Sequence, residues 1–122
     1  MNSGSAARET FSRVDRLRKR REFEECYASG VRHSGRLLQV FLRPRSGDSR
    51  IGISVPRRVG NAVTRNRLRR RVREIFRRNR GLFETTSADL VIHVRPAAAD
   101  VSFAELSEEY RRTVARGLAR LR

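Results

Sequence analysis

Residues 60–77 read GNAVTRNRLRRRVREIFR and combine a helical apolar stripe with a high density of arginine. The apolar side chains recur at positions i, i+4, i+7 and i+8, which places them on one face of an α-helix. They are Leu68, Val72, Ile75 and Phe76. Residues 65–80 contain nine arginines and one acid, Glu74, which is a net charge of +8. Because like charges one turn apart destabilise an isolated helix, we expect packing of the apolar stripe or a bound polyanion to hold it.

Two strand-like stretches precede this helix. Residues 37–42 are mostly apolar, and residues 50–55 alternate between apolar and small side chains, so that one face of the second strand would be buried. Residues 46–49, Ser-Gly-Asp-Ser, form a turn cluster between them. We therefore predict that the two strands pair as an antiparallel hairpin. A further short strand is expected near Val31.

Helices are predicted at both ends of the chain, with one more strand between them. Residues 14–28 carry an approximate apolar stripe, and residues 88–95 are apolar enough for a central strand. Ser102 and Glu105 match a capping box, after which helical apolar spacing continues to Leu121. The order is helix, strand, strand, helix, strand, helix, with the optional strand near Val31. This order predicts an α+β fold, a two-layer α/β sandwich built on one small sheet.

The composition points to a polyanionic partner. The 122-residue chain carries 29 Lys and Arg against 13 Asp and Glu, a formal net charge of +16, and this surplus is typical of nucleic-acid binding. We place a single domain at residues 14–122 behind a disordered tail at residues 1–13. No apolar run approaches the ~20 residues that span a membrane. A single cysteine, Cys26, excludes an internal disulfide, and we expect a cytoplasmic protein.

Catalytic constellations are nearly absent from the sequence. His93 alternates with apolar residues in a predicted strand, which favours a strand-face position over a general base, and His33 is far from it along the chain. Cys26 falls on the apolar face of the first predicted helix, where we expect it to pack rather than react. No carboxylate pair, glycine-rich phosphate loop or metal-ligand spacing is recognisable. The sequence therefore predicts binding, with no catalytic and no metal-ligating residue.

Several binding classes remain open from the residues alone. Arginines spaced along a helix can each meet a backbone phosphate, and the aromatic residues Phe23, Tyr27 and Phe41 suit either a core or a stacking surface for single-stranded nucleotides. A DNA-binding regulator with residues 61–79 as its recognition helix is disfavoured, because a strand precedes that helix. A membrane-surface helix is disfavoured because the core needs its apolar residues. A ribosomal or other structural RNA-binding protein is not excluded.

The quoted stretch resembles the signature of the bacterial ribonuclease P protein subunit, whose core is the Arg-Asn-Arg triplet found here at residues 65–67. Other blocks resemble the same family in the same order, and together they cover about residues 14–120. They are the opening at residues 16–23, the long strand at residues 35–42, the strand and basic pair at residues 51–58, and the strand end at residues 94–96.

This resemblance implies a subunit of a ribozyme. In the family the RNA subunit is the catalyst and removes the 5′ leader from precursor tRNA, with Mg²⁺ bound mainly through the RNA and the substrate. The expected partners are therefore the ribonuclease P RNA and precursor tRNA, with no further protein and no membrane required. The resemblance also implies a left-handed strand–helix–strand crossover through the signature, against the general right-handed preference.

The resemblance further assigns residues to two surfaces. The surface facing the catalytic RNA would comprise Asn61, Arg65, Asn66, Arg67, Arg69, Arg70 and Arg73. The leader would run in a cleft between the first helix and the sheet, lined by Phe23, Tyr27, Phe41, Arg57 and Arg58. The alternative function is that of a general structural RNA-binding protein.

Overall fold

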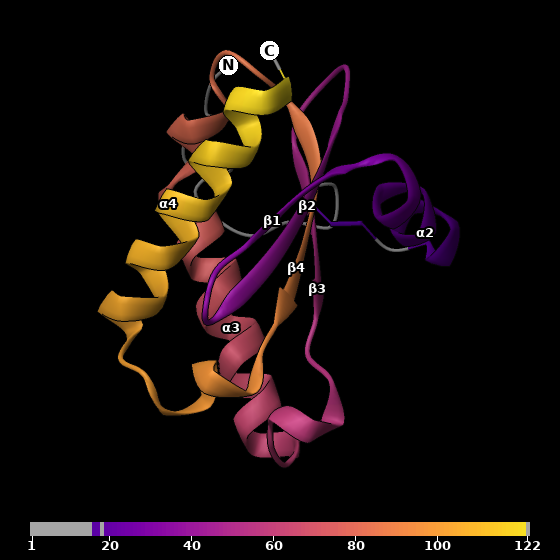
Figure 1. The fold of residues 1–122 in the computed structure, drawn as a ribbon. Coiled ribbons are helices and arrows are strands. Elements are labelled where there is room, and N and C mark those ends of the chain that lie inside the picture. The colour runs from indigo at the N-terminus through magenta and orange to yellow at the C-terminus, as the bar shows by residue number, and fades with distance from the viewer. Residues whose placement is uncertain (1–15, 18, 122) are drawn as a thin grey trace, which may run out of the picture.

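The structure is a computed structural model that describes residues 16, 17 and 19–121, and it shows one mixed sheet with helices on both faces (Figure 1). The helices are α2 (Arg20–Ser29), α3 (Ala62–Arg78) and α4 (Phe103–Leu121), and the strands are β1 (Val31–Ser34), β2 (Leu38–Pro44), β3 (Arg50–Ser54) and β4 (Ala88–Val94). Short 3₁₀ turns, η2 (Arg57–Val59), η3 (Arg80–Phe83) and η4 (Pro96–Asp100), lie between them. The predicted α+β fold is confirmed, including the short strand at Val31. The tail predicted at residues 1–13 lies outside the described residues.

The sheet has the strand order β1-β2-β4-β3. β1 and β2 form an antiparallel hairpin, β2 pairs antiparallel with β4, and β3 runs parallel to β4. The predicted hairpin between residues 37–42 and 50–55 is therefore wrong, because β4 lies between those strands. β4 is buried on both faces along most of its length. A central position removes more of that apolar surface from water than an edge position does.

Helix α3 connects the parallel strands β3 and β4 and begins and ends on asparagine. The Asn61 Oδ1 atom accepts a hydrogen bond from the Thr64 amide at 2.9 Å, which is a standard N-cap. At the other end the Asn79 Nδ2 atom donates to the Ile75 carbonyl at 2.7 Å. The predicted apolar stripe is confirmed as the buried face. It comprises Leu68, Val72, Ile75 and Phe76.

Helix α4 covers β1 and β2 on the same side of the sheet as α3 (Figure 1). The Ser102 Oγ atom accepts from the Glu105 amide at 3.1 Å, which is one of the two hydrogen bonds of the predicted capping box. Gly117 permits close packing, because a Cβ there would lie 2.3 Å from the Leu42 Cδ1 atom. The buried Glu109 carboxylate accepts from the amides of Leu37 at 2.7 Å and Leu38 at 2.8 Å, so α4 also anchors the β1–β2 turn.

Helix α2 lies alone on the opposite face of the sheet (Figure 1). It begins at Arg20. The prediction of a helix from residue 14 is therefore wrong for residues 16, 17 and 19, which the structure describes outside the helix. Arg16 bridges to Ile51, and the Leu17 amide donates to the Ile51 carbonyl at 2.9 Å. The Leu17 amide therefore bonds to the exposed edge of β3. In the longer predicted helix the same amide would have bonded within the helix. Under α2 a small apolar cluster forms from Leu17, Cys26 and Val91, with Phe23 and Phe41 partly buried against it.

A buried carboxylate also ties α2 to the sheet. Asp89 of β4 is 1% exposed and accepts two hydrogen bonds from Arg50, at 2.9 and 3.0 Å. The same guanidinium donates to Glu22 of α2 at 2.9 Å. Arg43 pairs with Glu25 at 3.1 Å and with Asp89 at 3.5 Å. Two acids of α2 therefore hold the helix on the sheet through arginines of β2 and β3.

Candidate nucleic-acid interface

The outer face of α3 presents exposed cationic and amide side chains. Asn66 and Arg70 are exposed, and Arg69 donates to the Asn66 Oδ1 atom at 2.8 Å. These side chains lie away from the buried stripe, because the helical period places them on the far side of the helix. The structure therefore brings these three predicted RNA-binding residues onto one accessible surface.

The remaining predicted residues of α3 are partly engaged in the fold. Arg67 donates to the Ala99 carbonyl at 3.2 Å, and the neighbouring Arg71 donates to the Val101 carbonyl at 3.3 Å. Arg65 is half-buried, and Asn61 is the N-cap of the helix. The side chains of Arg67 and Asn61 therefore have a structural role whether or not RNA is bound.

Arg73 lies on the flank of α3 that faces the edge of β3. With Arg16, Phe23 and Gly52 it lines a cavity of about 190 Å³ that opens between α3 and the sheet. Burial lowers the pKa of Arg73, and the charges of Arg16 and Arg69 lower that pKa further. The cavity brings this basic flank close to Phe23 on the α2 side.

The C-terminal end of α3 is partly neutralised. Glu74 binds Arg77, and its carboxylate also accepts from the Arg78 Nε atom at 2.6 Å. These hydrogen bonds hold the pKa of Glu74 below its usual range. The exposed positive surface of the helix is therefore concentrated nearer its N-terminus.

The three aromatic residues predicted to bind the leader lie on the α2 side of the sheet. Tyr27 is 40% exposed and meets Phe41 edge-on, with ring centroids 4.7 Å apart. Phe23 packs over Gly52, where a Cβ would lie 2.4 Å from the Phe23 Cζ atom, so Phe23 belongs more to the packing beneath α2. Arg57 and Arg58 are exposed in η2, just beyond the end of β3. Phe23 therefore packs in the small core, whereas Tyr27 keeps an exposed ring, and stacking of nucleotides on that ring stays a prediction.

The groups considered for catalysis occupy structural positions. Cys26 is fully buried, with its Sγ atom 3.4 Å from the Phe41 carbonyl, and burial raises the pKa of this thiol to about 11. The prediction that Cys26 packs is therefore confirmed. His93 lies on a strand face, also as predicted, and burial lowers its pKa. Across residues 16, 17 and 19–121, no group of three His, Cys, Asp or Glu side chains is placed to hold a metal ion.

Comparisons with known proteins agree with this geometry. A family model described as Ribonuclease P matches residues 11–117. This chain belongs to the ribonuclease P protein family. A relative from Clostridioides difficile, named ribonuclease P protein component, is 33% identical over 107 residues, which are 87% of this chain and 94% of the relative.

Solved structures of ribonuclease P proteins share the fold. The Thermotoga maritima protein superposes with a TM-score of 0.75 at 36% identity, covering 83% of this chain and 96% of that one. The Staphylococcus aureus protein, solved at 2.0 Å, gives a TM-score of 0.77 at 25% identity, covering 85% of this chain and 97% of that one. The fold and the multi-block sequence resemblance therefore point to the same family.

Membership in the ribonuclease P protein family, together with the fold, decides among the classes of binding protein that the sequence left open. In the structure β3 and η2 precede α3, so α3 lacks the preceding helix of a helix-turn-helix pair. The helices that the structure describes are all too short or too polar to cross a membrane. A DNA-binding regulator therefore loses its support. The burial of Leu68, Val72, Ile75 and Phe76 in α3 counts against a membrane-surface helix, which needs free apolar residues to insert.

Some surface residues of this ribonuclease P protein were not singled out by the sequence. Arg16 lines the cavity beside Arg73. Gln39 and Ser54 lie on the same sheet face as Phe41, next to His93. Because side chains alternate between the two faces of a strand, the sequence could have placed Gln39 on the same face as Phe41, two residues away. The pairing of β3 with β4, which places Ser54 beside His93, is visible only in the folded sheet.

Proposed function

We propose that this chain binds the ribonuclease P RNA through α3 and the 5′ leader of precursor tRNA through the α2 face of the sheet. Family membership implies association with ribonuclease P RNA. The observation that carries the assignment of surfaces is the exposed outer face of α3, where Asn66, Arg69 and Arg70 gather. Guanidinium groups bind phosphate bidentately, which suits a folded RNA backbone.

The proposed division of labour leaves the chemistry to the RNA subunit. Phosphodiester hydrolysis needs an activated nucleophile and stabilisation of developing charge, commonly by metal ions. The Cys26 thiol is buried and protonated, and His93 lies far along the sheet from the Asp89 network. Mg²⁺ would bind mainly through the RNA subunit and the substrate, while the protein supplies binding and charge neutralisation.

The proposed leader surface combines stacking and charge. Tyr27 offers an exposed ring, and base–aromatic stacking is tolerant of sequence because every base has a π-face. Arg57 and Arg58 lie beyond the end of β3, where they can meet leader phosphates. By binding a segment that the mature tRNA lacks, the protein would favour precursor over product.

Reconstitution tests this function. The purified chain is mixed with a bacterial ribonuclease P RNA and a precursor tRNA at magnesium concentrations where the RNA alone is nearly inactive, and leader release is measured. Restored cleavage at the mature 5′ end supports the proposal. RNA binding without any stimulation, at every magnesium concentration, would instead indicate a general structural RNA-binding protein.

Arg70→Ala provides the residue-level test of the α3 surface. We expect weaker binding to the RNA subunit with an unchanged melting temperature, and a salt dependence reduced by about 0.7–0.9 log units per log unit of salt, the contribution of one phosphate contact. Arg116→Ala is the matched control, because Arg116 is an exposed arginine of α4, outside the proposed RNA-binding surface of α3. Equal losses in both variants would indicate nonspecific attraction by the whole chain.

A further inference from the structure

Two large apolar side chains are exposed among the residues that the structure describes, and each lies on a surface proposed to bind RNA. They are Tyr27 on α2, which is 40% exposed, and Val63 in the first turn of α3, which is 73% exposed. Tyr27 packs against Phe41, whereas Val63 belongs to neither apolar cluster of the core. The fold itself therefore leaves a valine exposed on an arginine-rich helix.

The stability of α3 does not account for a valine at position 63. Valine is β-branched, and at an exposed helical site it is less favourable than alanine or arginine. The helix already begins at the Asn61 cap, and the nearby Gly60 and Ala62 are small residues that leave Val63 uncovered. A partner molecule is needed to remove this side chain from water.

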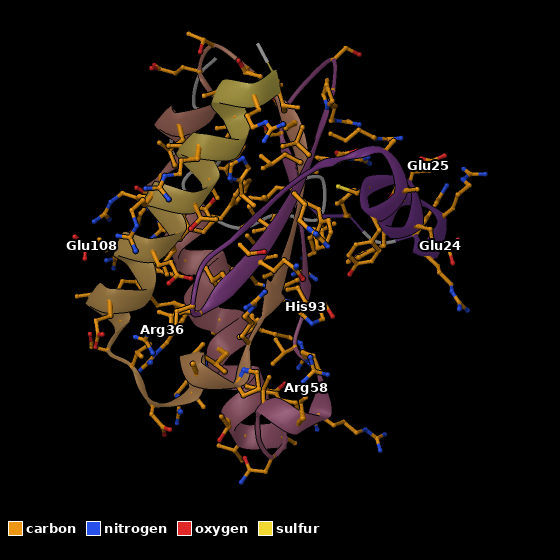
Figure 2. All side chains as sticks on the ribbon, viewed as in Figure 1. Glu24, Glu25, Arg36, Arg58, His93 and Glu108 are labelled. Carbon is orange, nitrogen blue, oxygen red and sulfur yellow. The ribbon has the colours of Figure 1, made fainter. Side chains whose placement is uncertain are left out.

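The side chains around Val63 favour RNA as that partner. Asn66 and Arg70 follow Val63 at positions i+3 and i+7, so the three side chains lie along one face of α3, and all three are exposed. Arg58 of η2 adds positive charge at the end of the molecule where α3 begins (Figure 2). An apolar side chain beside guanidinium and amide groups suits a nucleic acid, whose sugars and bases lie between phosphates.

Charge and apolar contact contribute differently to the binding of RNA. Guanidinium groups bind the phosphates of any RNA, and their contribution to affinity falls as the salt concentration rises. An apolar contact removes surface from water and is not screened by salt. It also requires a nucleotide at the matching position. Arginines alone would therefore bind many polyanions alike, whereas an apolar contact can favour one folded RNA surface.

We propose that Val63 packs against a sugar ring or base of the ribonuclease P RNA and gives the α3 surface a specificity for this RNA that salt does not screen. Asn66 and Arg70 hold the polar groups on either side of that contact. The inference rests on the proposed function, since it requires the RNA subunit to lie on α3.

The test measures the dissociation constant of the full chain for a bacterial ribonuclease P RNA over a series of salt concentrations. Val63→Thr keeps the shape of the side chain but places a hydroxyl in the contact, and Val63→Ala removes two methyl groups. We expect each variant to bind about 3- to 10-fold more weakly at every salt concentration, as partial loss of buried methyl groups would cause. The slope of log Kd against log salt should not change, because no phosphate contact is lost.

Controls separate this contact from charge and from general apolar truncation. Val31→Ala removes the same two methyl groups from a half-buried valine of β1, at the opposite edge of the sheet from β3, and should leave RNA binding unchanged. Arg70→Ala should reduce the slope instead of shifting the line in parallel. Polyuridylate is the comparison ligand, and its binding should be the same for the wild type and both Val63 variants.

The outcomes distinguish the inference from the proposed function. Wild-type affinity in both Val63 variants, with binding still weakened in Arg70→Ala, would overturn the inference alone. An equal loss of binding to polyuridylate would also overturn it, because the contact would then carry no specificity for the folded RNA. Wild-type binding and slope in Arg70→Ala would overturn the assignment of the RNA subunit to α3. A parallel shift confined to the ribonuclease P RNA would support the inference.

Discussion

The face of the sheet that packs on α3 and α4 is fully buried along the central strands β2 and β4, whereas the face under α2 is covered only in part. On β4 the side chains of Ala88, Leu90, Ile92 and Val94 toward α3 and α4 are fully buried. On the other face Val91 is buried, while His93 is only half-buried. Apolar burial on the first face supplies most of the folding free energy. The second face can therefore retain polar and aromatic groups for binding.

The two faces also differ in what attaches their helices. Helices α3 and α4 bury continuous apolar stripes. Helix α2 buries only Cys26 fully, and its acids pair with arginines of the sheet around Asp89. Apolar packing is insensitive to ionic strength, whereas partly exposed ion pairs are screened by salt. We therefore expect α2 to be less firmly held than α3 and α4.

The largest expected difference is between two phenylalanines. Phe76→Ala should lower the free energy of unfolding by about 3–5 kcal/mol, because Phe76 is fully buried in the main core. Phe23→Ala should cost only about 1–2 kcal/mol, because Phe23 is partly exposed in the small cluster. Urea unfolding measures both. Equal losses would contradict the difference between the faces.

The ionic attachment of α2 is tested by Arg50→Met, which keeps much of the apolar stem and removes the charge. Removing one partner of a buried ion pair typically costs 3–5 kcal/mol. We expect about 2–3 kcal/mol here, because Arg43 and Arg45 remain near Asp89. Hydrogen exchange should show the loss first in the amides of α2. Uniform acceleration across α3 and α4 would show that the network supports the whole domain instead.

Cys26 reports whether α2 stays docked. Because burial raises the pKa of this thiol to about 11, it should hold about 100-fold less thiolate at pH 8 than an ordinary thiol. Alkylation of the native protein should be slower by at least that factor and should become fast in urea. Arg50→Met should accelerate the native reaction. A native rate equal to the rate in urea would mean that α2 does not protect the thiol.

The smallest expected effect is the titration of His93. Its pKa should lie below the usual value of about 6.5. Arg58→Ala should raise it only in part toward the usual value, since burial is the larger cause. Because folding lowers this pKa, protonation opposes folding, and the free energy of unfolding falls as the pH drops below about 6.5. NMR titration of the imidazole measures the pKa. An unchanged pKa in Arg58→Ala would show that the charge of Arg58 does not lower it.

The local patterns in the sequence predicted most of the elements. The stripe of Leu68, Val72, Ile75 and Phe76 identified α3 and its buried face, and Ser102 with Glu105 identified the start of α4. These predictions succeeded because a helix period and a cap depend on residues within one or two turns. The excess of arginine likewise identified a polyanionic partner without reference to the fold.

Long-range pairing decided the rest. A turn cluster at residues 46–49 suggested that the flanking strands pair, yet β4 separates them because its apolar side chains need cover on both faces. The same pairing brings Ser54, His93 and Gln39 into one row and draws Leu17 onto the edge of β3. Which arginines remain free for RNA also depends on tertiary contacts, since Arg67 reaches Ala99 whereas Arg70 reaches solvent.

The sequence by itself therefore determined the family, the helices and the sign of the partner's charge, because these depend on composition and short-range periodicity. Only the tertiary structure decided the strand order, the placement of α2 and the composition of the binding faces. Those features depend on which distant segments compete for the same buried surface and the same backbone hydrogen bonds, and that competition is resolved only when the whole chain folds.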